Sequence, residues 1–207
     1  KNHLDPIPAP SWAYSKARDI LGSLQMDRPR AMELLRSLVQ EYPNDQQTLS
    51  FYANQLRQDK KYDEAAAMYN KVLAVAPDNT EALTILAVLA YARNNEKDAE
   101  TLIKKAENTG KMNRNDYSRM GFLLLVENKN KEAAHYYEKA VAISPVNVDF
   151  YNLACAYAKQ NQVDEAVKAL GTALKTGYGS KQQIADDGDF NLIRSNEKFK
   201  ALVDTLK

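Results

Sequence analysis

The acidic run from Asp186 to Asp189 holds three carboxylates around Gly188, and carboxylate oxygens are ligands that Ca²⁺ prefers in proteins. A calcium-binding loop also needs further oxygen ligands at regular spacing, and this segment lacks them. Aspartate beside glycine is equally typical of a turn that begins a helix. The sequence therefore favours a turn with a helix N-cap at this place over a calcium site.

The thiol and imidazole side chains are few and far apart. Cys155 is the only cysteine, which excludes an internal disulfide, and it falls in a helical pattern with no predicted basic partner. A cysteine of this kind is most often a small packing residue. His3 lies among prolines and His135 lies in a second helical pattern, so we expect His135 to be a solvated surface side chain. Two such histidines assemble neither a metal site nor a Ser/His/Asp constellation.

Nucleotide-binding and hydrolase motifs are incomplete or missing. Gly177 and Gly179 begin the spacing of a dinucleotide fingerprint, but Gln182 stands where the third glycine belongs. The sequence contains no Walker loop and no G-x-S-x-G elbow. We therefore expect no catalytic residue, no cofactor and no metal, and we expect that the protein is not an enzyme.

Charge and hydropathy exclude two further classes of function. The 28 basic residues nearly balance the 27 acidic ones, whereas nucleic-acid binders normally carry a marked basic excess. No run approaches eighteen apolar residues, so we expect no membrane insertion. The first residues lack the pattern of a signal peptide. The compartment stays open between cytoplasmic and, if a signal was removed, bacterial periplasmic or exported.

The elements that position these residues follow a repeating pattern. An alanine in the first turn of a helical pattern is followed twelve residues later by a proline at three places: Ala31 with Pro43, Ala65 with Pro77, and Ala133 with Pro145. Ala99 and Ala166 hold the same place without the proline, so the five alanines are 34, 34, 34 and 33 residues apart. A fixed period of this length predicts a helical solenoid.

We expect about five helix-turn-helix repeats within residues 11–180, with these approximate bounds: 12–45, 46–79, 80–113, 114–146 and 147–180. Residues 1–10 contain three alternating prolines and predict an extended linker. Such a linker suggests an export signal or another domain before it, with a frayed terminus as the alternative. Residues 181–207 end in an amphipathic pattern and predict a capping segment over the last repeat.

Small residues and helix ends support this arrangement. Helix axes approach closely only where the crossing side chains are small. We expect such crossings at four pairs: Ala53 with Ala65, Ala87 with Ala99, Gly121 with Ala133, and Ala154 with Ala166. Gly110 and Gly177 stand where two second helices end, at positions that predict a left-handed C-cap.

These residues resemble the tetratricopeptide repeat family. The fourth repeat matches the family pattern best, through Tyr117, Met120-Gly121, Ala133, Tyr137, Ala140 and Pro145. The first and third repeats depart from it, because Trp12 is out of register and Lys111 replaces the closing proline. The resemblance covers about residues 12–180. It implies an all-α, right-handed α-solenoid of about five repeats with a C-terminal capping helix.

In the resembling family, the first helices of successive repeats line a groove that holds a peptide or a partner helix. Transferred by register, the groove residues are Gln47, Ser50, Asn54, Arg57, Glu81, Thr84, Val88, Tyr91, Asn115, Ser118, Phe122, Leu125, Tyr151, Asn152 and Cys155. The apolar members Phe122, Leu125 and Tyr151 are either anchors for a ligand or packing residues against the cap or a second subunit. The Lys, Asn and Arg set with which chaperone-binding members grip a C-terminal carboxylate is absent.

Three functions are consistent with this sequence. The first is a non-enzymatic scaffold that binds a peptide or helix of a partner protein in the groove. The second is an accessory or regulatory repeat domain of a larger enzyme or exported protein. The third is a structural scaffold that associates with itself through exposed solenoid ends. The identity of the partner cannot be inferred from the sequence.

Overall fold

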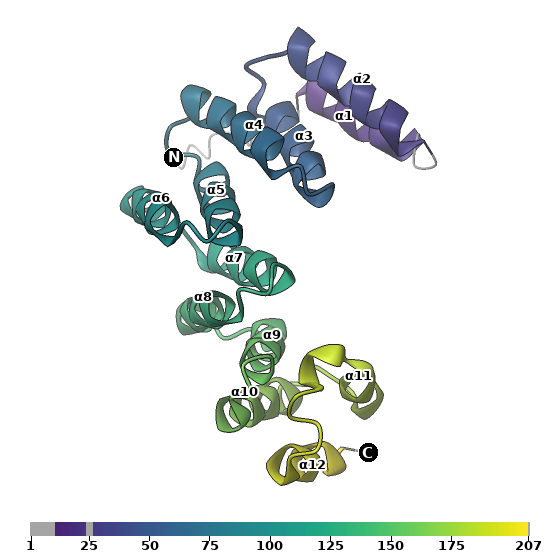
Figure 1. Cartoon of the computed structure of the whole chain (residues 1–207), viewed down its shortest axis with the longest axis vertical. Coiled ribbons are helices and arrows are strands. Elements are labelled where there is room, and N and C mark those ends of the chain that lie inside the picture. Colours follow the sequence, from purple (N-terminus) through teal and green to yellow (C-terminus); the bar gives the residue numbers. More distant parts are fainter. Residues whose placement is uncertain (1–10, 24–26, 207) are drawn as a thin grey trace, which may run out of the picture. The chain divides into compact units, whose positions relative to one another are not determined.

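The computed structural model describes residues 11–23 and 27–206, so the predicted linker at residues 1–10 lies outside the described residues. Over the described ranges the chain forms twelve α-helices, one 3-10 helix and no strand, which confirms the all-α expectation (Figure 1). The chain divides into two compact blocks: block one ends at Leu89 and block two begins at Ala90.

The helices of block one are α1 (Trp12–Ser23), α2 (Arg28–Glu41), α3 (Gln46–Gln58) and α4 (Tyr62–Val75), followed by α5 (Thr80–Ala92), which crosses the boundary. Block two continues with α6 (Glu96–Asn108), α7 (Arg114–Val126), α8 (Asn130–Ile143), α9 (Asn147–Ala158), α10 (Val163–Lys175), α11 (Lys181–Asp186), η1 (Gly188–Phe190) and α12 (Glu197–Asp204).

The helices begin at a fixed interval along the chain. First helices begin at residues 12, 46, 80, 114 and 147, so successive starts are 34 residues apart and once 33. The segment expected to be a cap keeps this interval, because α11 and α12 begin at residues 181 and 197, each 34 residues after α9 and α10. We interpret it as a sixth helix pair whose first helix is shortened to six residues.

In the second to fifth helix pairs, the turn between the two helices contains one residue with a left-handed backbone. Lys60, Asn94, Asn128 and Asn161 have φ of 57° or 58° and occupy the same place in four successive repeats. Asparagine tolerates this conformation better than most residues because its short side chain bonds locally. Lysine has no such adaptation, so Lys60 is the strained member of the set.

Helix starts and ends follow their local sequence. Asp45 caps α3, since its Oδ2 accepts the backbone N–H of Thr48 at 2.8 Å. Asn113 and Asp116 form a capping box at the start of α7. Gly110 and Gly177 have φ of +66° and +84°, which confirms the left-handed conformation predicted for them.

Within each pair the helices pack through small residues, as expected. Ala53 and Ala65 of the α3–α4 pair are fully buried. In the α7–α8 pair, Gly121 faces the ring of Tyr137, which is also fully buried, and a methyl group at Gly121 would lie 2.9 Å from three ring carbons. The close approach at this crossing is therefore set by Tyr137 as well as by Ala133.

Candidate functional site

Four of the predicted groove residues come together in block one around an open cleft of about 450 Å³. Gln47, Ser50 and Asn54 reach it from α3, and Glu81 reaches it from the first turn of α5. The other residues that line the cleft are Tyr14, Gln46, Phe51 and Asn79. Sequence reasoning missed these four.

The placement of the α3 residues follows from helix periodicity. Gln47, Ser50 and Asn54 recur at the spacing of one helical face. The opposite face carries Leu49 and Leu56, which are almost completely buried and fix the rotation of the helix. The polar residues are therefore turned outward by burial of the apolar ones.

Local hydrogen bonds hold the amide side chains in place. The backbone N–H of Ser11 donates to Oε1 of Gln47 at 2.9 Å, and this bond ties the start of α1 to α3. Arg57 donates to Oδ1 of Asn54 from Nη2 at 3.0 Å. Arg57 was predicted as a groove residue and does not line the cleft, but its guanidinium orients the amide that does.

Two aromatic rings form one wall of the cleft. Tyr14 of α1 and Phe51 of α3 pack edge to face, with ring centroids 5.7 Å apart and an interplanar angle of 86°. Tyr14 could not be assigned a register from the sequence, because Trp12 departs from the repeat pattern. Phe51 directly follows the predicted groove position Ser50, so the register transferred from the family did not include it.

The lining of the cleft favours binding over chemistry. Four amides, from Gln46, Gln47, Asn54 and Asn79, each carry N–H donors, while the side-chain oxygens of Gln47, Asn54 and Asn79 already accept hydrogen bonds within the chain. Glu81 is the only carboxylate among the lining residues, and none of them is a histidine, cysteine or lysine. The cleft thus lacks a paired acid and base and is well supplied with neutral hydrogen-bonding groups.

The remaining predicted residues of α5 are not accessible. Thr84 and Val88 are each 1% exposed and Tyr91 is 7% exposed. In block two, the hydroxyl of Tyr91 lies 3.5 Å from that of Tyr136. Burial raises the pKa of both phenols, so both stay protonated at neutral pH.

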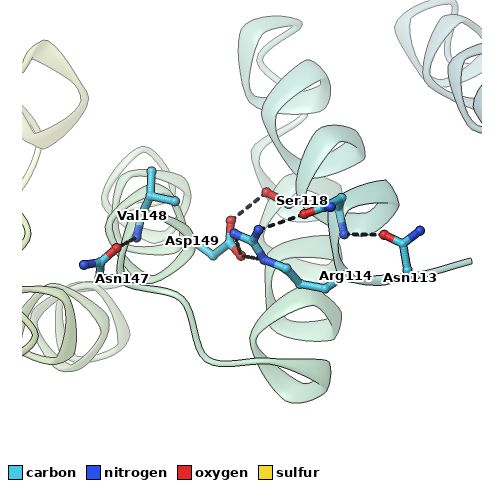
Figure 2. Close-up of polar contacts among 7 residues, drawn as sticks. Asn113, Arg114, Ser118, Asn147, Val148 and Asp149 are labelled. Atoms are coloured by element: carbon cyan, nitrogen blue, oxygen red, sulfur yellow. Dashed lines mark hydrogen bonds and ion pairs between the residues drawn. The ribbon is translucent and has the colours of Figure 1, made fainter.

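A buried carboxylate joins α7 and α9 in block two. Asp149 is fully buried, and Arg114 donates to its Oδ2 from Nε at 2.7 Å and from Nη2 at 2.6 Å (Figure 2). Ser118 donates to the other carboxylate oxygen at 2.6 Å. The predicted groove residue Ser118 therefore supports the Arg114–Asp149 ion pair by a hydrogen bond. Asn115, also a predicted groove residue, accepts a hydrogen bond from Nη1 of Arg114 at 2.9 Å.

The apolar groove residues of block two divide into exposed and buried ones. Phe122 is 53% exposed on α7, whereas Leu125 is 9% exposed. Val126, one turn after Phe122, is 57% exposed. Phe122 and Val126 thus form a small uncovered apolar surface.

The groove positions of α9 are covered by the C-terminal segment. The hydroxyl of Tyr151 donates to Oδ2 of Asp187 at 2.8 Å, and its ring packs against Phe190 with centroids 5.7 Å apart. Lys159 pairs with Asp189 at 3.2 Å. For Tyr151 the structure thus shows packing on the C-terminal segment, which was one of the two expected outcomes; Asn152 beside it is half-buried.

The acidic run and the cysteine meet at this same place. Ligand-type atoms of Cys155, Asp187 and Asp189 lie within 4.8 Å of one another. The two carboxylates already bind the Tyr151 hydroxyl and the Lys159 ammonium, and Asp187 accepts the N–H of Asp189 at 2.9 Å as the N-cap of η1. Burial raises the pKa of the Cys155 thiol, as does Asp187, which disfavours the thiolate that metals and electrophiles require.

Comparisons with known proteins support the repeat pattern. A family model described as "Tetratricopeptide repeat" matches residues 56–119 and 124–185, and a second model with this description matches residues 21–45. A chloroplast protein of Arabidopsis thaliana is 32% identical over 116 residues, which cover 54% of this chain and 34% of that protein. The matched region thus spans about a third of the length of this curated relative.

Solved structures show the same fold. MamA from Desulfovibrio magneticus RS-1, from residue 41 to its end, has a TM-score of 0.54 at 15% identity, covering 86% of this chain and all of that chain. PilW, described as a widely conserved type IV pilus biogenesis factor, has a TM-score of 0.59 at 13% identity, covering 93% and 99% of the two chains. At these identities the likeness shows an all-α repeat solenoid. Among the described residues, no helix is long and apolar enough to span a membrane.

Proposed function

This chain belongs to the tetratricopeptide repeat family, whose fold is generally a non-enzymatic scaffold for protein interactions, and we propose that its block-one cleft binds an extended segment of a partner protein. The amide-rich lining of the cleft carries this proposal. The proposal includes that the chain has no catalytic activity of its own and does not bind nucleic acid.

An extended peptide presents unpaired backbone N–H and C=O groups along its length. Asparagine and glutamine match these groups, since each side-chain amide carries one acceptor and two donors. Gln47 and Asn54 lie on one face of α3, with their acceptor oxygens already fixed by Ser11 and Arg57. Recognition through backbone groups places little demand on the partner's sequence, so a neighbouring contact must supply the selectivity.

The aromatic wall supplies apolar contact. Tyr14 and Phe51 are both half-buried, so part of each ring faces the cleft. A side chain of the bound segment that packs there removes apolar surface from water, worth about 25 cal/mol per Å². The cleft therefore combines polar backbone recognition with one apolar anchor.

The experiment is a selection of displayed random twelve-residue peptides on the purified chain, followed by affinity measurement by fluorescence polarisation. Replacing Ser50 and Asn54 together by alanine removes one hydroxyl and one amide from the cleft. We expect the selected peptides to bind this variant at least about tenfold more weakly, because two hydrogen bonds of about 1 kcal/mol each are lost.

The matched control replaces Ser37 and Gln40, an exposed hydroxyl and amide on α2 of the same block. Neither residue lines the cleft, so peptide affinity should stay unchanged. Equal affinity of the Ser50/Asn54 variant and the control, with helical content intact in both, would refute the assignment of this cleft.

A second candidate is a repeat domain within a larger protein. The Arabidopsis thaliana relative favours it, since the matched region makes up only 34% of that protein. The cleft would then dock a partner for activity located elsewhere in the same protein. Sequencing the complete reading frame distinguishes the two candidates: a second folded domain supports this one, and an isolated repeat array removes it.

A further inference from the structure

A second cleft, of about 460 Å³, lies in block one. Phe51 lines both clefts, so the second continues the first across one aromatic ring. Its lining residues are Arg18, Leu21, Gly22, Arg28, Phe51, Gln55 and Gln58. Helices α1, α2 and α3 all contribute.

The charges in this second cleft are of one sign. Arg28 is already compensated, because its guanidinium pairs with Asp59 at 2.7 Å and also donates to Gln55. Arg18 is exposed, and within residues 11–23 and 27–206 its guanidinium has no ion-pair partner and lies over the ring of Tyr14, 6.0 Å from the centroid. None of the lining residues is acidic. The cleft therefore presents one uncompensated guanidinium beside an apolar floor, by which we mean the side chains of Leu21 and Phe51.

A guanidinium held over an aromatic ring is a binding group for carboxylates, because its planar N–H fork matches two carboxylate oxygens. A single such charge does not suit a nucleic-acid backbone, which is bound by several cations. Because the two clefts share Phe51, a bound segment that extends beyond the amide-lined cleft would bring one of its side chains to Arg18.

We propose that block one selects partner segments that carry an internal aspartate or glutamate, and that Arg18 binds its carboxylate in the second cleft. The apolar floor accommodates the methylene groups of the acidic side chain. This inference rests on the proposed function of the first cleft, and it adds the selectivity that backbone recognition lacks.

The test uses the peptides selected on the wild-type chain. We expect them to be enriched in aspartate or glutamate, and we expect the Arg18→Glu variant to bind them about tenfold more weakly at about 50 mM salt. The loss should shrink at about 500 mM salt, where exposed charges are screened. Peptides whose acidic residue is replaced by lysine should regain affinity for this variant.

Two further variants sharpen the result. Arg30→Glu makes the same charge change on α2 outside both clefts and should leave affinity unchanged. Gly22→Leu adds an apolar side chain at the second cleft, and its Cβ meets nothing within 4 Å. It should weaken binding to an extent that does not depend on salt.

The outcomes separate the two proposals. One outcome would overturn this inference and leave the proposed function standing. In it, the selected peptides need Ser50 and Asn54, but they show no acidic enrichment and bind the Arg18→Glu variant as tightly as the wild type. Peptides that bind only through a free C-terminal carboxylate, and lose affinity on amidation, would also overturn it. Peptides indifferent to Ser50 and Asn54 would remove the proposed function itself.

Discussion

Replacing Gly121 by alanine tests the packing of the repeat directly. The added methyl group would lie 2.9 Å from three carbons of the Tyr137 ring, and that ring is fully buried and cannot swing into solvent. Overpacking of this kind costs about 1–3 kcal/mol. Alanine also gains about 1 kcal/mol over glycine in a helix, so the net loss is smaller than the steric cost.

Gly171→Ala separates the two effects. Gly171 also lies inside a helix of block two, but its added methyl group would lie 3.7 Å from Leu202, an ordinary contact. This variant should gain up to about 1 kcal/mol, and the difference between the two variants should equal the steric cost of about 1–3 kcal/mol. Urea unfolding followed by circular dichroism at 222 nm measures both.

A compensating change gives the steric account a second test. The fifth repeat places Ala154 and Leu170 where the fourth places Gly121 and Tyr137, and both are fully buried. Adding Tyr137→Leu to Gly121→Ala should recover part of the lost stability. The second repeat has Ala53 and a fully buried Tyr69 where the fourth has Gly121 and Tyr137. Because alanine and tyrosine coexist at this crossing, we expect the steric cost of Gly121→Ala to lie towards the lower end of the range. A Gly121→Ala variant as stable as Gly171→Ala would refute this reasoning.

Three further predictions concern other contacts. Arg114→Met leaves the buried carboxylate of Asp149 without its cation and should lower the free energy of unfolding by about 3 kcal/mol, measured by urea unfolding. Lys60→Asn removes a left-handed lysine (φ 58°) and should raise it by about 0.5–1 kcal/mol, measured by thermal unfolding. Lys139 lowers the pKa of Glu107, so the stability that Glu107 supplies is complete above the unfolded pKa of about 4.3 and is lost as pH falls through the lower folded value. Wild type and Glu107→Gln should therefore converge in unfolding midpoint as the pH falls below about 4.3.

Matched variants decide each of these. Replacing both Arg114 and Asp149 by apolar residues should recover most of the stability lost by Arg114→Met; no recovery contradicts the buried-charge explanation. Asn161→Lys, at a left-handed position with φ of 58°, should destabilise by about as much as Lys60→Asn stabilises. If each of these variants is as stable as the wild type, the role assigned to the left-handed turn is wrong. A constant gap between wild type and Glu107→Gln at all pH values would contradict the ion pair with Lys139.

The repeat architecture was predictable because its sequence signals are local. Ala65 and Pro77 mark a helix start and end within one repeat, and their recurrence needs no knowledge of distant contacts. The same register identified Gln47, Ser50 and Asn54 as one face of α3, and the structure brings these three to one cleft. That they bind a partner stays a proposal.

Contacts between repeats were not predictable, because periodicity does not say which side chains meet across them. Tyr14 meets Phe51 from a helix that carries little of the family pattern. In the sequence, Asp149 has the pattern of an ordinary acidic residue in the first turn of a helix. Only the fold shows that it is buried and that Arg114 donates to it. Cys155 is covered because α11 ends after six residues and the chain turns onto α9, which the helical pattern did not indicate.

The most direct test of the central claim is photo-crosslinking of a selected peptide to the purified chain. Para-benzoylphenylalanine replaces Gln47 in the cleft in one variant and the exposed Gln40 on α2 in another. The account predicts a crosslinked product from position 47 that excess unlabelled peptide competes away, and none from position 40. Crosslinking from position 40 alone, or equally from both positions, would contradict it.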